Sequence, residues 1–324
     1  MKSLDTKLTN LHARPGAAGD FILADAKDAD MAFGLASPGV DPASGKPRSL
    51  ADYRDQIREI TRQGLVDIML MSVSTSELLT VHERLFDSSS VTPAVRANDS
   101  SDVHAITGGG YAGQPSRPFR TATLYQIRHS ARVDMALYSV TPANDPDLDI
   151  ASLQAYRDFR QEAAGEGVRH FLEVFAPIVR ELMPRDPGRF LNDFVARAVA
   201  GIPRNGRPLF LKMPYYGAEV MQELAAYDPH LIPGILGGAS GTTYDAFSLL
   251  EDARRNGARA ALFGRKIKDS DHPLTFVQYL RRIADGELDA QTACRSYHSD
   301  LAALGITPQR TLEDDLRLTE RWAR

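Results

Sequence analysis

The most constraining feature of this 324-residue sequence is a repeated alternation of short apolar runs with segments of helical periodicity. Between the runs, apolar residues recur at helical spacing, as in the segment that follows Ser49, a predicted N-cap. Apolar strands that alternate with amphipathic helices indicate a parallel sheet covered on both faces. Eight runs have this character: 21–25, 66–72, 91–96, 133–140, 171–175, 208–216, 232–238 and 260–264.

Eight such units favour an α/β fold of the (β/α)8 TIM barrel type, which typically needs roughly 250 residues plus insertions. A doubly wound sheet is the alternative, but no Gly-x-Gly-x-x-Gly motif follows the first run to support a dinucleotide-binding fold. We therefore expect a single barrel domain over 1–324, with a lead-in at 1–20 and extra helices in a C-terminal extension at 288–324. The Ser-, Gly- and Pro-rich insertion at 98–118 is either a lid or a disordered loop.

Composition excludes several classes of protein. The net charge of -4 leaves no broad basic surface for nucleic acid. The single cysteine, Cys294, excludes an internal disulfide and a cysteine zinc cluster, and suits a reducing compartment. The first ten residues contain no signal-peptide pattern, and no apolar run reaches membrane-spanning length. We expect a cytoplasmic protein that binds neither nucleic acid nor a membrane.

The sixth apolar run carries a lysine, Lys212, near its end, and Pro214 stops the run. Burial disfavours the charged form of a lysine, and a neutral amine can attack a carbonyl carbon. The alternative is a lysine whose amine reaches the surface or pairs with a neighbouring carboxylate. Taken alone, the position of Lys212 favours a structural lysine over a nucleophile.

Other charged residues also fall where runs end. Asp25, Arg96 and Glu173 lie at or near the C-terminal ends of the first, third and fifth runs. Because active sites of barrels lie at these ends, we expect these three side chains to converge with Lys212. Lys27 and Asp28 follow Asp25 closely and are further candidates. Asp67 and Asp134 begin their runs instead, so we expect them to be structural acids at the opposite end of the barrel.

The last two units have the features of an anion site. Gly237 and Gly238 leave the seventh run and lead into a helix, and the eighth run ends in Gly264 and Arg265. Glycines let backbone N–H groups approach a ligand, and a helix N-terminus favours negative charge. The loops after strands seven and eight are the usual phosphate site of these barrels. We therefore predict that a phosphate or a similar anion binds here.

The segments Lys212-Met213-Pro214-Tyr215, Gly237-Gly238-Ala239-Ser240 and Gly264-Arg265-Lys266-Ile267 resemble those of class I aldolases of the archaeal fructose-bisphosphate type. They also resemble tagatose-bisphosphate and sulfofructose-phosphate aldolases and a related autoinducer-processing thiolase. The resemblance implies a Schiff base on Lys212 and a phosphate held by the four residues of the predicted anion site. It further implies that Asp25 orients the substrate or supports proton transfer.

The sequence departs from these families at two positions. Their first strand usually continues Asp-His-Gly or Asp-Gln-Arg, whereas this chain has Asp25-Ala26-Lys27. The fructose-bisphosphate type carries a tyrosine acid on strand five, where this chain has Phe175; Glu173 instead resembles the glutamate of the tagatose and sulfosugar branch. These departures leave the acid/base open between Glu173 and Asp25, with Tyr138, Tyr215 and Tyr216 in reserve. They argue against a plain fructose-bisphosphate aldolase.

Together these observations predict a lyase that makes or breaks a C–C bond of a phosphorylated ketose through an imine on Lys212, with no metal or organic cofactor. One alternative is a metal-assisted lyase or isomerase with Asp25, Asp28 and Glu173 as ligands. A sugar-phosphate-binding barrel without catalysis is another. The predicted catalytic residues are Lys212, Glu173 and Asp25, and the predicted substrate-binding residues are Gly237, Gly238, Gly264, Arg265, Arg96, Lys27 and Asp28. The resemblance also implies a homo-oligomer.

Overall fold

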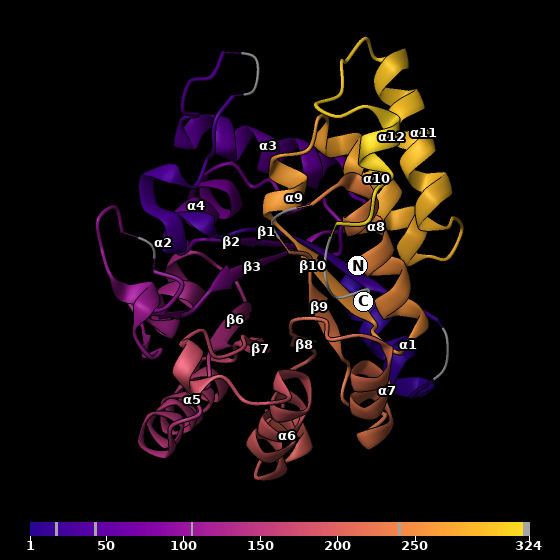
Figure 1. Ribbon diagram of the computed structural model, residues 1–324. Helices are drawn as coiled ribbons and strands as arrows, with labels where there is room; N and C mark the ends of the chain where they lie inside the picture. The colour runs from indigo at the N-terminus through magenta and orange to yellow at the C-terminus, as the bar shows by residue number, and fades with distance from the viewer. Residues whose placement is uncertain (17–18, 42–43, 105, 239–240, 320–324) are drawn as a thin grey trace.

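The chain folds into an eight-stranded parallel barrel surrounded by helices, as the sequence predicts (Figure 1). The computed structural model describes residues 1–16, 19–41, 44–104, 106–238 and 241–319. Around the sheet the order of strands is β8-β7-β6-β3-β2-β1-β10-β9. The barrel strands are β1 (Ile22–Lys27), β2 (Ile68–Met71), β3 (Thr92–Arg96), β6 (Met135–Val140), β7 (Arg169–Val174), β8 (Leu211–Lys212), β9 (Gly234–Leu236) and β10 (Ala260–Phe263).

Hydrogen bonds across the first and last strands of this order close the sheet into a barrel. The Met213 amide donates to the Gly234 carbonyl at 3.0 Å, and the Leu236 amide donates to the Met213 carbonyl at 2.9 Å. β9 therefore lies between β8 and β10, and every barrel strand has two neighbours. A closed barrel has no free sheet edge.

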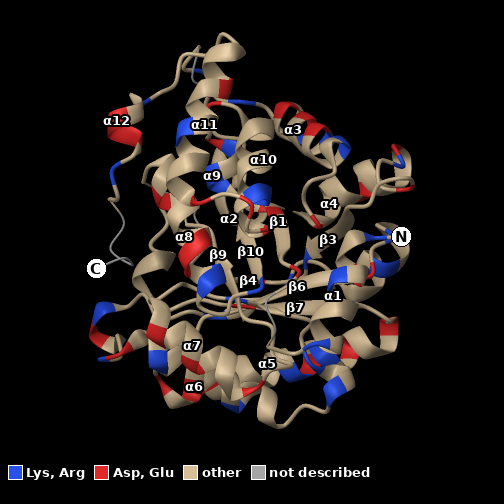
Figure 2. Cartoon of the chain, turned by 90° about the vertical axis from the view of Figure 1, so that its right-hand side faces the viewer, with Lys and Arg blue, Asp and Glu red and all other residues tan. Residues whose placement is uncertain are grey.

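Helices between the strands cover the outside of the barrel, and the last ones form a further layer. α11 packs on α8 and α10, so the C-terminal extension covers the helices that follow β9 and β10 (Figure 1). These outer helices carry many charged residues (Figure 2). The helices are α1 (Ser3–Ala13), α2 (Ala29–Phe33), α3 (Leu50–Gln63), α4 (Val73–Ser76), α5 (Pro146–Glu166), α6 (Pro187–Ala200), α7 (Ala218–Tyr227), α8 (Thr243–Arg255), α9 (Arg265–Lys268), α10 (Pro273–Ala284), α11 (Ala290–Ala303) and α12 (Leu312–Asp315).

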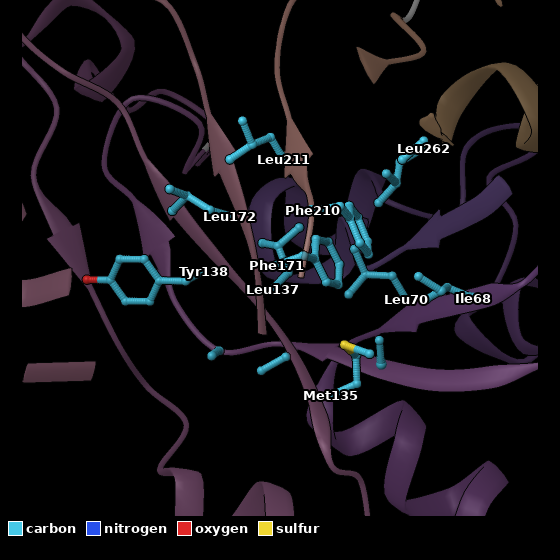
Figure 3. Close-up of a cluster of buried hydrophobic side chains, with 14 of the residues drawn as sticks. Ile68, Leu70, Met135, Leu137, Tyr138, Phe171, Leu172, Phe210, Leu211 and Leu262 are labelled. Carbon is cyan, nitrogen blue, oxygen red and sulfur yellow. The ribbon is translucent and has the colours of Figure 1, made fainter. Parts of the chain in front are cut away.

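The barrel interior is filled by apolar side chains that alternate with outward-facing ones along each strand. The rings of Phe171 and Phe210 stack inside with their centroids 4.6 Å apart, next to Leu70 and Leu137 (Figure 3). Tyr138, one residue after Leu137, points the other way and packs against rings of α5. This packing closes the barrel below its C-terminal mouth, so a ligand can enter only at the mouth.

The N-terminal end of the barrel is closed by α1, a helix within the predicted lead-in at 1–20. Leu4, Leu8 and Leu11 of α1 are buried in the barrel core. Lys7 and Arg281 contact Asp67 at 2.8 Å and 3.2 Å, and Arg169 contacts Asp134 at 3.1 Å, so both predicted structural acids are confirmed at this end. In the described part of the chain no helix has the length and apolar character needed to cross a bilayer.

The insertion at 98–118 is more ordered at its base than a plain loop. The two-residue strands β4 (Asp99–Ser100) and β5 (Pro118–Phe119) pair antiparallel and bring the ends of the insertion together.

The structure confirms the predicted N-cap at Ser49. This residue forms a capping box with Asp52 at the start of α3.

Candidate active site

A cavity of about 150 Å³ lies at the C-terminal mouth of the barrel. Eight of the ten predicted site residues line it: Asp28, Arg96, Glu173, Lys212, Gly237, Gly238, Gly264 and Arg265. They come from β1, β3, β7, β8, β9 and β10 or from the residues that follow these strands. A larger cavity of about 490 Å³ lies at the other end of the barrel, and none of its lining residues was predicted as a site residue.

Lys212 and Glu173 face each other inside this cavity. They are aligned in register on neighbouring parallel strands, so their side chains point to the same side of the sheet, into the barrel. The Lys212 amine contacts Oε1 of Glu173, and both side chains are buried. Lys212 thus pairs with a neighbouring carboxylate, which was the structural alternative to a nucleophilic lysine. The pair also lines the cavity, however. An amine and a proton acceptor therefore meet where a small ligand fits.

Arg96 holds the other oxygen of Glu173. Its Nη2 atom donates to Oε2 of Glu173 at 2.9 Å, and its Nε atom donates to Oδ2 of Asp28 at 2.5 Å. Nη1 donates to Oγ of Ser139 at 3.0 Å, and that hydroxyl donates to the same Oε2 of Glu173. Both oxygens of Glu173 thus have fixed partners, so the carboxylate is held in one orientation beside Lys212.

These contacts determine the charge of the carboxylate. Burial alone would raise the pKa of Glu173, but the Lys212 and Arg96 cations outweigh burial and hold that pKa below its ordinary value. For Arg96, burial favours deprotonation, yet Asp28, Glu173 and Asp99 raise the pKa of the guanidinium above its ordinary value. The cavity therefore contains an ionised glutamate fixed by a permanent cation.

The two glycine turns lie side by side at the β9 and β10 side of the mouth. A Cβ atom on Gly237 would stand 2.1 Å from the Phe263 ring, and one on Gly264 would stand 2.5 Å from the Ala26 carbonyl oxygen. Packing therefore requires glycine at both positions, whether or not a ligand binds. The Gly237 amide is already bonded to the Leu262 carbonyl, whereas Gly238 has a φ of 68° and open space around its Cβ position.

Arg265 is the cation beside these turns. Its guanidinium lies over the Phe33 ring at 5.7 Å and forms no hydrogen bond or ion pair within the described residues. Burial lowers the pKa of Arg265, with Asp269 acting in the opposite direction. An anion bound here would offset that loss of hydration.

The N-terminus of α8, which the sequence suggested for anion binding, is occupied by carboxylates of the protein. Asp245 forms a capping box with Thr242, and Asp315 accepts from the Thr243 amide at 2.7 Å. Lys266 points away from the cavity and donates to the Gly241 carbonyl at 2.6 Å. Ala239 and Ser240 lie outside the described residues. Of the residues predicted for the anion site, Gly238, Gly264 and Arg265 are therefore the ones whose surroundings leave room for an anion.

The structure does not bring Asp25 and Lys27 into the cavity. β1 extends to Lys27, two residues beyond the predicted end of the run, and Asp25 is in register with Phe263 and Met69, which face the helices. Lys27 lies 3.3 Å from Asp25 and 5.9 Å from the Tyr53 ring of α3, with neither charged side chain exposed. Burial raises the pKa of Asp25 to about 6 and lowers the pKa of Lys27, each against the effect of its partner.

Sequence reasoning missed several residues that complete the site. Tyr53 of α3, Phe33 of α2 and Val103 of the insertion line the cavity, and Ser139 supports Glu173 from β6. Ser139 could have been found, since it follows the same inward alternation as Leu137. The reserve tyrosines do not line the cavity: Tyr138 faces α5, Tyr215 donates to Asp252, and Tyr216 is partly exposed.

The carboxylates of the predicted metal alternative do not converge. Asp25 faces the helix layer. Inside the barrel, Asp28 is paired with Arg96, and Glu173 is paired with both Arg96 and Lys212. Among the described residues, one group has Cys, His and Asp ligand atoms close together: Cys294, His298 and Asp315, at the C-terminal helices. The donor set at the cavity therefore fits ion pairing within the protein better than a metal site.

Comparisons with known proteins agree on the fold. No protein-family model and no curated protein match this sequence. A Schiff-base-forming fructose-1,6-bisphosphate aldolase matches the structure with a TM-score of 0.62 and 16% identity, over 86% of this chain and 99% of that one. The fructose-bisphosphate aldolase from Slackia heliotrinireducens matches with a TM-score of 0.66 and 14% identity, over 91% and 89%.

A third match is an archaeal fructose-1,6-bisphosphate aldolase with its catalytic lysine bound to the carbinolamine intermediate of the substrate. Its TM-score is 0.60 at 16% identity, over 86% of this chain and all of that one. The structures of the proteins that the sequence resembles are thus among its matches. At this identity the similarity establishes the barrel fold, and the chemistry rests on the residues of the cavity.

The buried pair of Asp25 and Lys27 gives a first prediction. Lys27→Met should lower the free energy of unfolding by about 3–5 kcal/mol, because the buried Asp25 carboxyl loses its partner and must either keep an unpaired charge or bind a proton. The double variant Asp25→Leu, Lys27→Met should recover most of this loss, since apolar residues replace both charges. Urea unfolding measures both. A double variant less stable than Lys27→Met would contradict the structural role of the pair.

Proposed function

We propose that this protein is a class I aldolase, which makes or breaks a C–C bond of a phosphorylated ketose through a Schiff base on Lys212. One observation carries the proposal: a buried amine and an ionised carboxylate face each other in a small cavity that Gly238, Gly264 and Arg265 also line. The resemblance at Lys212, Gly237 and Gly264 agrees with it. So does the covalently bound catalytic lysine of the structurally similar archaeal aldolase.

The reaction requires Lys212 as a neutral amine, so the Lys212 cation must first lose a proton. Oε1 of Glu173 is in contact with Nζ, so it can accept the proton that an ammonium must lose. The amine adds to the ketone carbon, and the former carbonyl oxygen takes one proton from the amine and one from protonated Glu173 and leaves as water. The product is an iminium that attracts electrons from the neighbouring bond, and Glu173 is a carboxylate again. Because the iminium is positively charged, the Glu173 carboxylate stabilises it at the same place.

Glu173 is also the acid/base of the C–C step. Its carboxylate takes the proton of the aldol hydroxyl as the C–C bond breaks, and the bonding electrons move into an enamine while the hydroxyl carbon becomes an aldehyde. Protonated Glu173 then gives this proton to the enamine carbon, which restores the carboxylate and the iminium. Water hydrolyses the iminium to release the ketone and free Lys212. Arg96 and Ser139 position Glu173 for both transfers.

The substrate phosphate binds between Gly238, Gly264 and Arg265. The ketone then lies over Lys212, since β8 neighbours β9 in the barrel. Binding of this remote group fixes the orientation of the reacting carbon. Val103 brings the insertion to the edge of the cavity, and we infer that 98–118 is a lid that excludes water. A homo-oligomer and a cytoplasmic location stay predictions from the sequence.

The alternatives account for less of the site. In a metal-assisted lyase, Asp25 could not be a ligand, because it lies outside the cavity. A metal ion would also have to displace Arg96 from Asp28 or Lys212 from Glu173. A binding protein without catalysis leaves the amine and the carboxylate at the cavity floor unexplained. Burying such a pair costs desolvation free energy, and ligand binding at the glycine turns does not require it.

The direct test is reduction with sodium borohydride in the presence of dihydroxyacetone phosphate, and of pyruvate in parallel. Intact mass and peptide mapping should find a covalent adduct on Lys212 with dihydroxyacetone phosphate. Lys212→Met should form no adduct, whereas Lys268→Met, which removes another buried lysine, should form it as before. No adduct with either ketone, together with activity abolished by a chelator, would contradict the imine mechanism.

A second prediction concerns the acid/base. Glu173→Gln should lower kcat by about 100- to 10,000-fold, because the amide cannot accept a proton. Glu219→Gln makes the same chemical change on a side chain that is 78% exposed, and kcat should stay unchanged. Steady-state kinetics of dihydroxyacetone phosphate release measures both. A loss of less than about tenfold in Glu173→Gln would assign the proton transfer to another group.

A further inference from the structure

The wall of the cavity opposite the anion site carries excess negative charge. Resting on the proposed function, we propose that the substrate has one charged end only: a ketone phosphate joined to, or released from, an uncharged aldehyde. The phosphate next to the ketone would bind at Arg265, and the rest of the chain would extend toward an end of the cavity that disfavours a second phosphate.

The order of the strands defines these two ends. In the closed barrel, β3 lies four places from β9, and β6 lies four places from β10, so each pair faces the other across the mouth. Arg96 ends β3, Ser139 lies in β6, and Val103 belongs to the insertion that follows β3. A substrate that places its phosphate at the glycine turns and its ketone at Lys212 therefore reaches toward Arg96 and Val103.

Arg96 cannot serve as a second phosphate site, because the protein already compensates its charge. Three carboxylates surround this one guanidinium: Asp28 at 2.5 Å, Glu173 at 2.9 Å and Asp99 at 3.8 Å. All four side chains are buried, so water screens their charges little. A second phosphate at this end would face a local excess of negative charge.

No other cation compensates this excess along the described lining of the cavity. The remaining lining cations are Lys212, which contacts Glu173 and takes the ketone, and Arg265 at the opposite end. Val103 gives the far side an apolar surface, and Phe175, which follows β7, adds apolar surface at the neighbouring part of the lining. An uncharged, partly apolar chain end is therefore complementary to this wall, whereas a phosphate is not.

The test is the choice of acceptor in the condensation direction. With dihydroxyacetone phosphate as donor, kcat/KM is measured for D-glyceraldehyde and for D-glyceraldehyde 3-phosphate. We expect the uncharged aldehyde to be favoured by about tenfold or more, since like charges brought together in a buried site discriminate strongly. Equal or better use of the phosphorylated aldehyde, or no use of glyceraldehyde, would overturn the proposal.

A charge at the far wall should change this preference. Val103→Lys should raise the kcat/KM for glyceraldehyde 3-phosphate relative to glyceraldehyde by about tenfold, whereas Val103→Met, uncharged and similarly long, should leave the ratio unchanged. An unchanged ratio in Val103→Lys would overturn the assignment of this wall. The borohydride adduct of dihydroxyacetone phosphate does not involve the far wall, so its loss would contradict the aldolase proposal separately.

Discussion

The arrangement of the cavity depends on one buried cation. Arg96 bonds Glu173, Asp28 and Ser139 from a position inside the barrel, and without it two carboxylates would face each other out of water. Its charge keeps Glu173 ionised, and Glu173 in turn holds the Lys212 amine. The same network makes the β3 side of the mouth unsuitable for a second anion. Catalytic geometry and substrate choice therefore have a common physical origin.

The sequence predicted the barrel well because its physical signal is strong and repeated. Strands covered on both faces must be apolar throughout, and eight such runs with helices between them allow few folds. Lys212, Glu173 and Arg96 were found because each interrupts an apolar run near its end, where charge is costly without a reason. The glycine turns were found by their position after the last two strands.

The failures of the sequence reasoning have specific causes. Asp25 was placed at a strand end, but β1 continues to Lys27, and alternation along the strand turns both side chains toward α3. The anion site was predicted to use the N-terminus of α8, but Asp315, which is distant in sequence, occupies it. Tyr53 follows the apolar spacing of α3, and Phe33 and Val103 follow no local pattern; only the tertiary fold brings these three residues to the cavity.

The most direct test of the account is a crystal structure of the protein after borohydride reduction with dihydroxyacetone phosphate. We predict continuous density from Nζ of Lys212 to the former carbonyl carbon, with the phosphate at Gly238, Gly264 and Arg265 and Glu173 still bonded to Arg96. Density for the phosphate at Arg96, or an unmodified Lys212 beside bound ligand, would contradict the account.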